Sequence, residues 1–296
     1  MNRMRKLLLA LALAVVPFGI AACGGDSKTA DGSTAASADC TKAGLTTKTA
    51  GTLTFGTDNP AFPPWFGGGE KNKPWQINDP STGQGYESAV AYAVAEKLGF
   101  AATEVTWKPI KFDTSFAPGP KEFDAFINQV SITPERAKNV DFSSGYYNVN
   151  QAVVSLADKP IASAASIADL KGYKLGAMVG TTSFNAIEQK VAPNDKPAVF
   201  NSNEDAVNAL KNGQIEGIVV DLPTGYFVTA AQLDDKGKIV GQFPSDGAPE
   251  QFGMVLEKGS TLTSCISKAV DDLRADGTLE KLETQWLAGA AAPFLK

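Results

Sequence analysis

The sequence predicts an α/β protein with two domains and largely parallel sheets. Strand-like and helix-like stretches alternate along the chain after about residue 50, which is the pattern of βα units. The length of 296 residues is about twice that of a typical domain. A hydrophobic content of 43% is sufficient for a core, and 20% charged residues is ordinary for a globular protein.

The first half of the folded body is predicted from periodicity and from residues that begin and end helices. Leu53 and Phe55 alternate with threonine in the first strand, and Gly99 suits the end of the first helix. Thr133 and Pro134 suit the N-cap and first turn of another helix. The predicted elements are a strand over 51–57, a helix over 87–98, strands over 105–110 and 124–130, and a helix that begins at 133–136.

The second half continues the alternation. Asn203 is the predicted N-cap of a helix that Gly213 ends, and an apolar run predicts a buried strand that leads to Asp221. The predicted elements are strands over 151–156, 174–179, 218–220 and 252–256, and helices over 183–190, 203–211, 262–275 and 278–287.

Four positions lie where predicted strands end: Asp58, Gln129, Gly180 and Asp221. Ligands of α/β sheets bind at the carboxyl ends of strands. These residues therefore indicate a ligand site.

The chain contains no histidine, which excludes several kinds of chemistry. It excludes nucleophilic catalysis with a histidine base, and histidine-ligated zinc or haem. With 27 Lys and Arg against 32 Asp and Glu, the net charge of −5 does not favour nucleic acid. We find no phosphate-binding or dinucleotide-binding glycine motif and no metal-ligand spacing, so we expect no cofactor and no metal.

The N-terminal segment has the three parts of a secretory signal peptide: a start rich in Arg and Lys, an apolar run over 7–16, and small residues before Cys23. The apolar run is shorter than the ~20 residues of a membrane-spanning helix, although an N-terminal anchor helix is the alternative. The Ile-Ala-Ala-Cys ending resembles a bacterial lipobox, which implies removal of 1–22 and lipidation of Cys23.

Residues 23–45 are predicted to hold this lipidated cysteine and a flexible tether, because Gly, Ser, Thr, Ala and Asp dominate the segment. Cys40 and Cys265 then remain. In an exported protein such a pair is more often bridged than free, and the alternative is two unrelated thiols.

Segments spread along 51–287 together resemble the family 3 extracellular solute-binding proteins, the polar amino-acid receptors of ABC importers. They are Leu53-Thr54-Phe55-Gly56-Thr57-Asp58, Phe62-Pro63-Pro64-Trp65, Gly85-Tyr86-Glu87, Ser131-Ile132-Thr133-Pro134-Glu135-Arg136-Ala137-Lys138, Val140-Asp141-Phe142-Ser143, Ile167-Ala168-Asp169-Leu170-Lys171-Gly172, Gly180-Thr181-Thr182, Ala209-Leu210-Lys211-Asn212-Gly213, Val219-Val220-Asp221 and Leu273-Arg274-Ala275-Asp276-Gly277-Thr278.

This resemblance implies the two-lobed type II periplasmic-binding-protein fold, in which two α/β lobes are joined by two hinge crossover strands. Lobe 1 would comprise 46–150 and 251–290, and lobe 2 would comprise 151–250. The crossovers would lie near 150–153 and 249–253.

A zwitterionic amino acid needs one fixed cation and one fixed anion. Arg136 matches the family's carboxylate-binding position, and a guanidinium can bind two oxygens at once; the alternative is a solvated arginine in a first helical turn. Asp221 matches the ammonium-binding position, and its alternative is the N-cap of a helix that begins at Pro223. Neither group normally titrates between about pH 5 and 8, so binding is predicted to be flat in that range.

The resemblance implies further contacts. Ser131, Thr181 and Thr182 are similar to additional carboxylate donors, with turn capping as the alternative. Phe62 and Trp65 would stack on the aliphatic part of the ligand and exclude water, with core packing as the alternative.

Asn128 and Gln129 would narrow the pocket or contact a polar ligand side chain. Glu87 matches an acidic family position, or lies in a first helical turn where the helix dipole favours it. Ala89 stands where relatives often have a second Asp, which argues mildly against Lys or Arg as ligand.

The resemblance thus implies a non-enzymatic, monomeric receptor outside the cytoplasm, held to the membrane by a lipid anchor alone. It would bind a polar or neutral L-amino acid and deliver it to an ABC permease and ATPase. One alternative is a cyclohexadienyl-dehydratase-like enzyme on the same fold, for which Glu87 is the acid that can be placed. The other is a ligand-sensing lobe for a membrane signalling partner.

Overall fold

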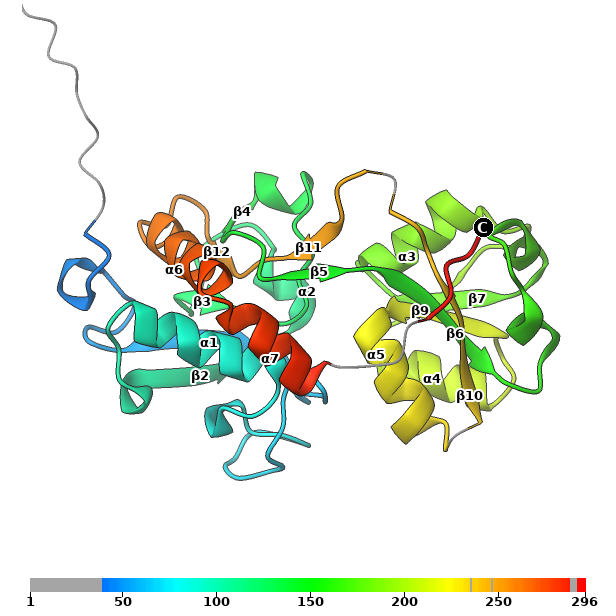
Figure 1. The fold of residues 1–296 in the computed structure, drawn as a ribbon, viewed down its shortest axis with the longest axis horizontal. Coiled ribbons are helices and arrows are strands. Elements are labelled where there is room, and N and C mark those ends of the chain that lie inside the picture. Colours follow the sequence, from blue (N-terminus) through cyan, green and yellow to red (C-terminus); the bar gives the residue numbers. More distant parts are fainter. Residues whose placement is uncertain (1–38, 235, 246, 288–291) are drawn as a thin grey trace, which may run out of the picture. The chain divides into compact units, whose positions relative to one another are not determined.

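The computed structural model describes residues 39–234, 236–245, 247–287 and 292–296, and the strands in it form two five-stranded sheets and one two-stranded sheet (Figure 1). The first sheet has the order β2-β1-β3-β12-β4. Its parallel strands are β1 (Leu53–Thr57), β2 (Val105–Pro109) and β3 (Ala125–Phe126); β12 (Val255–Glu257) runs antiparallel to β3 and to β4 (Val140–Phe142).

The helices α1 (Tyr86–Lys97), α6 (Thr263–Ala275) and α7 (Thr278–Trp286) pack on the first sheet around a core that includes Leu53 and Phe55 (Figure 1). A second apolar cluster, formed with the short helix α2 (Phe112–Ser115), includes Phe126 and Val255. Gly85 precedes α1 with φ +90°, and a Cβ there would lie 2.4 Å from Phe66 Cα. Glycine is therefore required at this position.

The second sheet has the order β10-β6-β9-β7-β8. Successive side chains of β6 face opposite sides, since Val153 belongs to the core beside α3 and Val154 to the core beside α4. The strands are β6 (Gln151–Leu156), β7 (Leu175–Met178), β8 (Ala198–Phe200), β9 (Gly217–Asp221) and β10 (Gly237–Gln242), and the helices are α3 (Thr182–Ala186), α4 (Asn203–Lys211) and α5 (Leu222–Phe227). Single π-turns, η7 (Ile187–Val191) and η8 (Val228–Gln232), extend α3 and α5.

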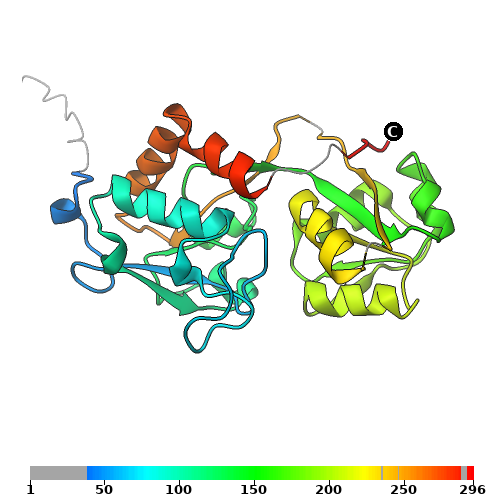
Figure 2. The same cartoon turned by 60° about the horizontal axis from the view of Figure 1, so that its bottom comes forward.

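Two strands carry the chain between these sheets. The strands β5 (Tyr147–Val149) and β11 (Glu250–Phe252) pair antiparallel, with Glu250 opposite Val149. Only Asn150 separates β5 from β6, and the green ribbon runs from one into the other (Figure 2). The mixed α/β sheets and these two passages agree with the two-lobed fold that the sequence predicts.

The C-terminal residues 292–296 return to the second sheet, which the sequence did not predict. The backbone N–H of Gln242 donates to Pro293 O at 2.8 Å, and the N–H of Leu295 donates to Gln242 O at 2.9 Å. Leu295 is buried in the core of that sheet. A segment of five residues is too short to carry a periodicity that could have indicated this contact.

The folded body begins earlier than the predicted boundary at residue 46. Cys40 and Cys265 form a disulfide, which joins the N-terminal segment to the first turn of α6. A 3₁₀ turn over Lys42–Gly44 follows, and Lys48 N donates to Asp124 Oδ1 at 2.7 Å. The predicted signal peptide, Cys23 and the front of the predicted tether lie outside the described residues.

Three element predictions need correction. The predicted strand over 124–130 is only two residues long, because the chain leaves the sheet at Ile127 and Gln129 has φ +48°. The predicted helix at 133–136 is a turn and a three-residue 3₁₀ helix, Arg136–Lys138, since β4 begins at Val140. The N-cap of α4 is Ser202 and not Asn203, because Ser202 Oγ accepts from Asp205 N at 3.0 Å.

Across the described ranges, none of the helices combines the length and the apolar character needed to span a bilayer.

Candidate functional site

Arg136 is 8% exposed and therefore is not a solvated surface arginine. Its guanidinium donates from Nη1 to Ser131 O at 2.8 Å and from Nη2 to Gly180 O at 2.9 Å. The ring centroids of Phe116 and Phe112 lie 4.4 and 5.6 Å from Cζ. Burial lowers the pKa of Arg136 to about 10, which leaves the group charged at neutral pH. Because Gly180 follows β7, Arg136 connects a loop of the first sheet to one of the second.

The short 3₁₀ helix changes one part of the expectation for Arg136. Three residues of 3₁₀ helix do not supply the row of free N–H groups and the dipole that a longer helix offers an anion. The electrostatic attraction for a carboxylate at this position therefore comes from the guanidinium itself.

Two hydroxyl groups meet beside Arg136. Ser131 Oγ and Thr182 Oγ1 are 3.2 Å apart, and Ser131 Oγ also donates to Glu250 Oε1. A hydroxyl has one hydrogen, so Ser131 accepts from Thr182 while it donates to Glu250. Thr182 is the first residue of α3, and this contact also joins elements of the two sheets.

Asp221 ends β9 and occupies the N-cap position of α5, but its side chain makes no capping bond. Instead, Asp221 Oδ1 accepts from Gln151 Nε2 at 2.7 Å. The pKa of Asp221 is raised to about 8, chiefly by burial and next by the negative charge of Glu250. The N-cap alternative is thus correct for the backbone position and incorrect for the side chain.

Gln151 and Glu250 belong to the site although the sequence prediction did not include them. Gln151 Nε2 lies 3.3 Å from each oxygen of Glu250 and 3.3 Å from Thr182 Oγ1, while Ser183 Oγ donates to Gln151 Oε1 at 2.5 Å. Both residues lie in the predicted crossovers. A polar residue at the start of a buried strand was the available signal for Gln151.

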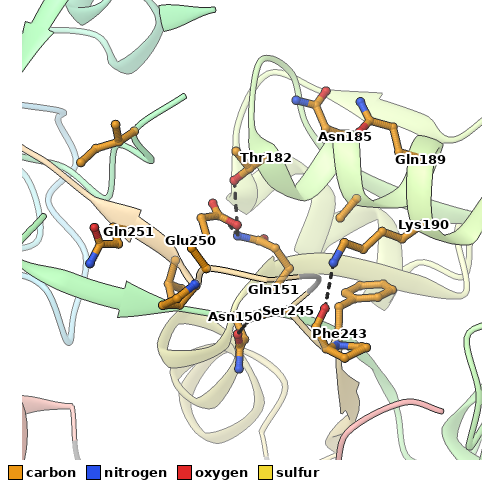
Figure 3. A pocket seen from close by; sticks show the side chains of 16 residues that line it. Asn150, Gln151, Thr182, Asn185, Gln189, Lys190, Phe243, Ser245, Glu250 and Gln251 are labelled. Atoms are coloured by element: carbon orange, nitrogen blue, oxygen red, sulfur yellow. Dashed lines mark hydrogen bonds between the residues drawn. The ribbon is translucent and has the colours of Figure 1, made fainter. Parts of the chain in front are cut away.

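A cavity of about 530 Å³ opens next to this polar cluster (Figure 3). Gln151, Thr182 and Glu250 form one part of its wall, and Asn185 and Gln189 from α3 and η7 extend it. Thr182 is the one predicted ligand residue that lines the cavity. The cavity therefore adjoins the predicted amino-acid site rather than coinciding with it.

Glu87 and Gln129 lie beneath the site and bind each other. Glu87 is fully buried; it accepts from Gln129 N at 2.6 Å, from Gln129 Nε2 and from the Tyr146 hydroxyl. Burial raises the pKa of Glu87 to about 7. Three donors of the protein already bond to this carboxylate. The structure therefore does not show Glu87 or the Gln129 side chain in a position to contact a ligand.

The other predicted residues are placed as follows. Trp65 is 2% exposed and packs edge-on against Tyr86, Tyr147 and Phe252, which is core packing; its Nε1 donates to Thr224 Oγ1 at 3.0 Å. Thr181 caps α3 by accepting from Phe184 N, Asn128 accepts from Thr57 Oγ1 at 2.9 Å, and Phe62 is half-buried in the loop after β1.

The chain is similar to known proteins over most of its length. The sequence profile of the bacterial extracellular solute-binding proteins, family 3, matches residues 66–289. The arginine-binding extracellular protein ArtP of Bacillus subtilis is 28% identical over 224 residues, which are 73% of this chain and 83% of ArtP. ABC transporter arginine-binding protein 1 of Escherichia coli is 30% identical over 211 residues, or 68% of this chain and 81% of the relative.

Among solved structures, an ancestral arginine-binding protein bound to glutamine superposes with a TM-score of 0.66 at 32% identity, covering 81% of this chain and 100% of that chain. These named relatives are binding proteins and not enzymes. The chain therefore belongs to the bacterial extracellular solute-binding proteins of family 3, and it is a solute-binding protein that acts outside the cytoplasm.

Proposed function

We propose that this protein captures a free L-amino acid between two lobes and delivers it to the permease and ATPase of an ABC importer. The observation that supports this proposal is that Arg136, in a loop of the first-sheet part, lies near Asp221, which ends β9 of the second sheet. Arg136 is close enough to lower the pKa of Asp221 by its charge, although other causes raise that pKa further. The lobes we propose are 46–150 with 251–290, and 151–250.

In this proposal Arg136 binds the α-carboxylate. Within the described residues, its guanidinium donates to two backbone carbonyls and not to a carboxylate, so its charge has no fixed anionic partner. The Ser131 and Thr182 hydroxyls, which bond to Glu250 and to each other in this structure, turn to donate to the carboxylate when the ligand binds. Asp221 binds the α-ammonium, since its carboxylate has only the Gln151 amide as a hydrogen-bond donor in the described part of the chain.

The side chain of the ligand is proposed to be polar or neutral, as the sequence suggested. Polar amides and hydroxyls around the cavity support a polar ligand. The named relatives include arginine-binding proteins, and the ancestral protein is described with glutamine bound. These names agree with a polar ligand of either charge.

The proposed cellular setting follows from the N-terminal sequence. Export by residues 1–22 and lipidation of Cys23 would hold a monomeric receptor at the outer side of the cell membrane. The disulfide between Cys40 and Cys265 supports an oxidising compartment.

The test is a thermal-shift screen of the mature protein against the common L-amino acids, with each D-enantiomer as a control. A ligand at 100 times its Kd should stabilise the protein by about 2.7 kcal/mol. Arg136→Ala should abolish the response, whereas Lys138→Ala, which removes an exposed cation two residues away, should retain it. The absence of a response to every L-amino acid, or an unchanged response in Arg136→Ala, would contradict the proposal.

A further inference from the structure

Two carboxylates share one amide nitrogen in the proposed amino-acid site. Gln151 Nε2 donates to Asp221 Oδ1 at 2.7 Å and lies 3.3 Å from both oxygens of Glu250. The two acids come from β9 of the second sheet and from β11, which carries the chain back to the first sheet. Seventy residues separate Gln151 from Asp221 and 99 separate it from Glu250, so only the fold brings the acids together.

Once Asp221 is ionised, as it must be to bind an ammonium group, the negative charge at this place exceeds the positive charge. Arg136 is the cation whose field reaches Asp221, and it is also the group proposed to bind the ligand carboxylate. Lys190 lines the same cavity, but its Nζ donates to Pro244 O at 2.8 Å, on the side away from Glu250 (Figure 3). Glu87 adds a further acidic group beneath the site. The other polar side chains that line the cavity here are neutral: Gln151, Thr182, Asn185 and Gln189.

A zwitterionic ligand does not remove this imbalance, because it brings one positive and one negative charge. Two acids and one guanidinium then still leave one negative charge in a partly desolvated site, where like charges repel strongly. A ligand with an additional positive charge balances the cluster. A ligand with a second carboxylate makes the imbalance worse.

Glu250 lines the cavity, where it can contact the additional positive charge of such a ligand. Ser131 Oγ donates to the Glu250 carboxylate and also contacts Thr182 Oγ1. The acid is therefore held close to these two hydroxyls. Glu250 and Thr182 both line the cavity of about 530 Å³ (Figure 3). A side chain that extends from an α-carbon held near Thr182 can therefore pass beside Glu250.

We propose that Glu250 is a specificity-determining residue that makes this site select an L-amino acid with a cationic side chain. The inference rests on the proposed amino-acid-binding function and narrows it. It replaces the mild argument against a basic ligand, which depended on Ala89. The negative charge that the sequence did not find on α1 is supplied instead from β11.

The test compares L-arginine with L-citrulline, which has nearly the same shape and lacks the positive charge. Calorimetric affinities are measured at pH 7.5 for the unaltered protein, for Glu250→Gln, and for Glu188→Gln, which removes an exposed charge on η7. The unaltered protein and Glu188→Gln should bind arginine at least about tenfold more tightly than citrulline, which corresponds to about 1.4 kcal/mol. Glu250→Gln should lose most of this preference, with arginine affinity falling about tenfold and citrulline affinity changing less than threefold.

Equal binding of arginine and citrulline by the unaltered protein overturns the inference without any use of a variant. An undiminished preference in a folded Glu250→Gln protein also overturns it, because the selection then comes from another group. Binding of neutral amino acids with no preference for arginine leaves the proposed function intact and removes only this inference. A failure to bind any amino acid contradicts the proposed function as well.

Discussion

Two carboxylates in this molecule have strongly raised pKa values, and they differ in how the protein satisfies them. Glu87 lies within the first-sheet part and accepts three hydrogen bonds, from Gln129 N, Gln129 Nε2 and the Tyr146 hydroxyl. Asp221 lies where elements of both sheets meet and, in the described residues, accepts one hydrogen bond, from Gln151. Burial is the largest cause of the raised pKa in both cases.

The difference separates an acid that the fold itself satisfies from the acid that we propose binds the ligand. A buried carboxylate with all its donors supplied by neighbouring residues has little capacity left for a ligand. A buried carboxylate with one donor and a second acid nearby is an unfavourable arrangement for the free protein, and a cation relieves it. The pKa shift alone does not distinguish the two acids; the number and origin of their hydrogen-bond donors do, and our proposal for Asp221 rests on that difference.

The largest expected effect is that of Asp221→Asn. Removing the charge should weaken ligand binding about 1000-fold, or roughly 4 kcal/mol, because the α-ammonium loses its anionic partner. The raised pKa means that Asp221 stabilises the fold below its unfolded pKa and that this contribution is lost as the pH rises through about 8. The free variant should therefore melt about 2–4 °C higher than the unaltered protein at pH 8.5.

Calorimetry and thermal melting measure both parts of this prediction. Asp158→Asn is the matched control, since it makes the same chemical change at an exposed site in the second-sheet part. An Asp221→Asn protein that binds normally would show that the ammonium contacts another group.

Glu87 should give the opposite pattern. Glu87→Ala leaves the Gln129 N–H and the Tyr146 hydroxyl without an acceptor, so the free energy of unfolding should fall by about 3 kcal/mol. Glu87→Gln should cost only about 1 kcal/mol, because one amide oxygen can accept both bonds and the Gln129 amide can turn over. In both variants the folded protein should bind the ligand within threefold of the original affinity.

Chemical denaturation gives the stability change, and Glu96→Ala, an exposed position on the same helix α1, is the control. If Glu87→Gln lowers the affinity more than about tenfold while remaining stable, Glu87 is a ligand residue after all and the contrast with Asp221 disappears.

The sequence was sufficient for elements whose periodicity is long or whose ends carry a clear signal. Helix α1 was found because apolar residues repeat along one face and Gly99 ends it. Strand β9 was found because its apolar run is continuous up to Asp221. The helix expected at 133–136 was wrong because the motif Thr-Pro-Glu-Arg satisfies local capping rules, while the nearby strand β4 leaves room for only one turn.

The site was predictable only in part for a different reason. Arg136 and Asp221 lie in motifs that resemble those of a known family, so their positions carried a signal. Glu250 lies in a strand of three residues, and its relation to Asp221 depends on Gln151, which lies 99 residues away in the sequence. No local pattern encodes a contact that requires two crossover strands to lie side by side.

The prediction that most sharpens the contrast is the pH dependence of binding. The sequence predicted flat binding from about pH 5 to 8, on the assumption that Asp221 titrates normally. With its pKa raised to about 8, part of the protein holds a proton on Asp221 at neutral pH, and the ligand ammonium must displace it. The affinity should therefore rise as the pH increases from 6 to 8, by at most about tenfold per pH unit, and level off above 8.

Calorimetry in two buffers with different ionisation enthalpies should detect proton release on binding at pH 7. Glu87 keeps its donors in the bound protein, so Glu87→Gln should show the same slope; its midpoint should be lower, because the Glu87 charge contributes to the raised pKa of Asp221. Flat binding in the unaltered protein, without proton release, would mean that Asp221 is ionised before the ligand arrives and that the proposed difference between the two acids does not exist.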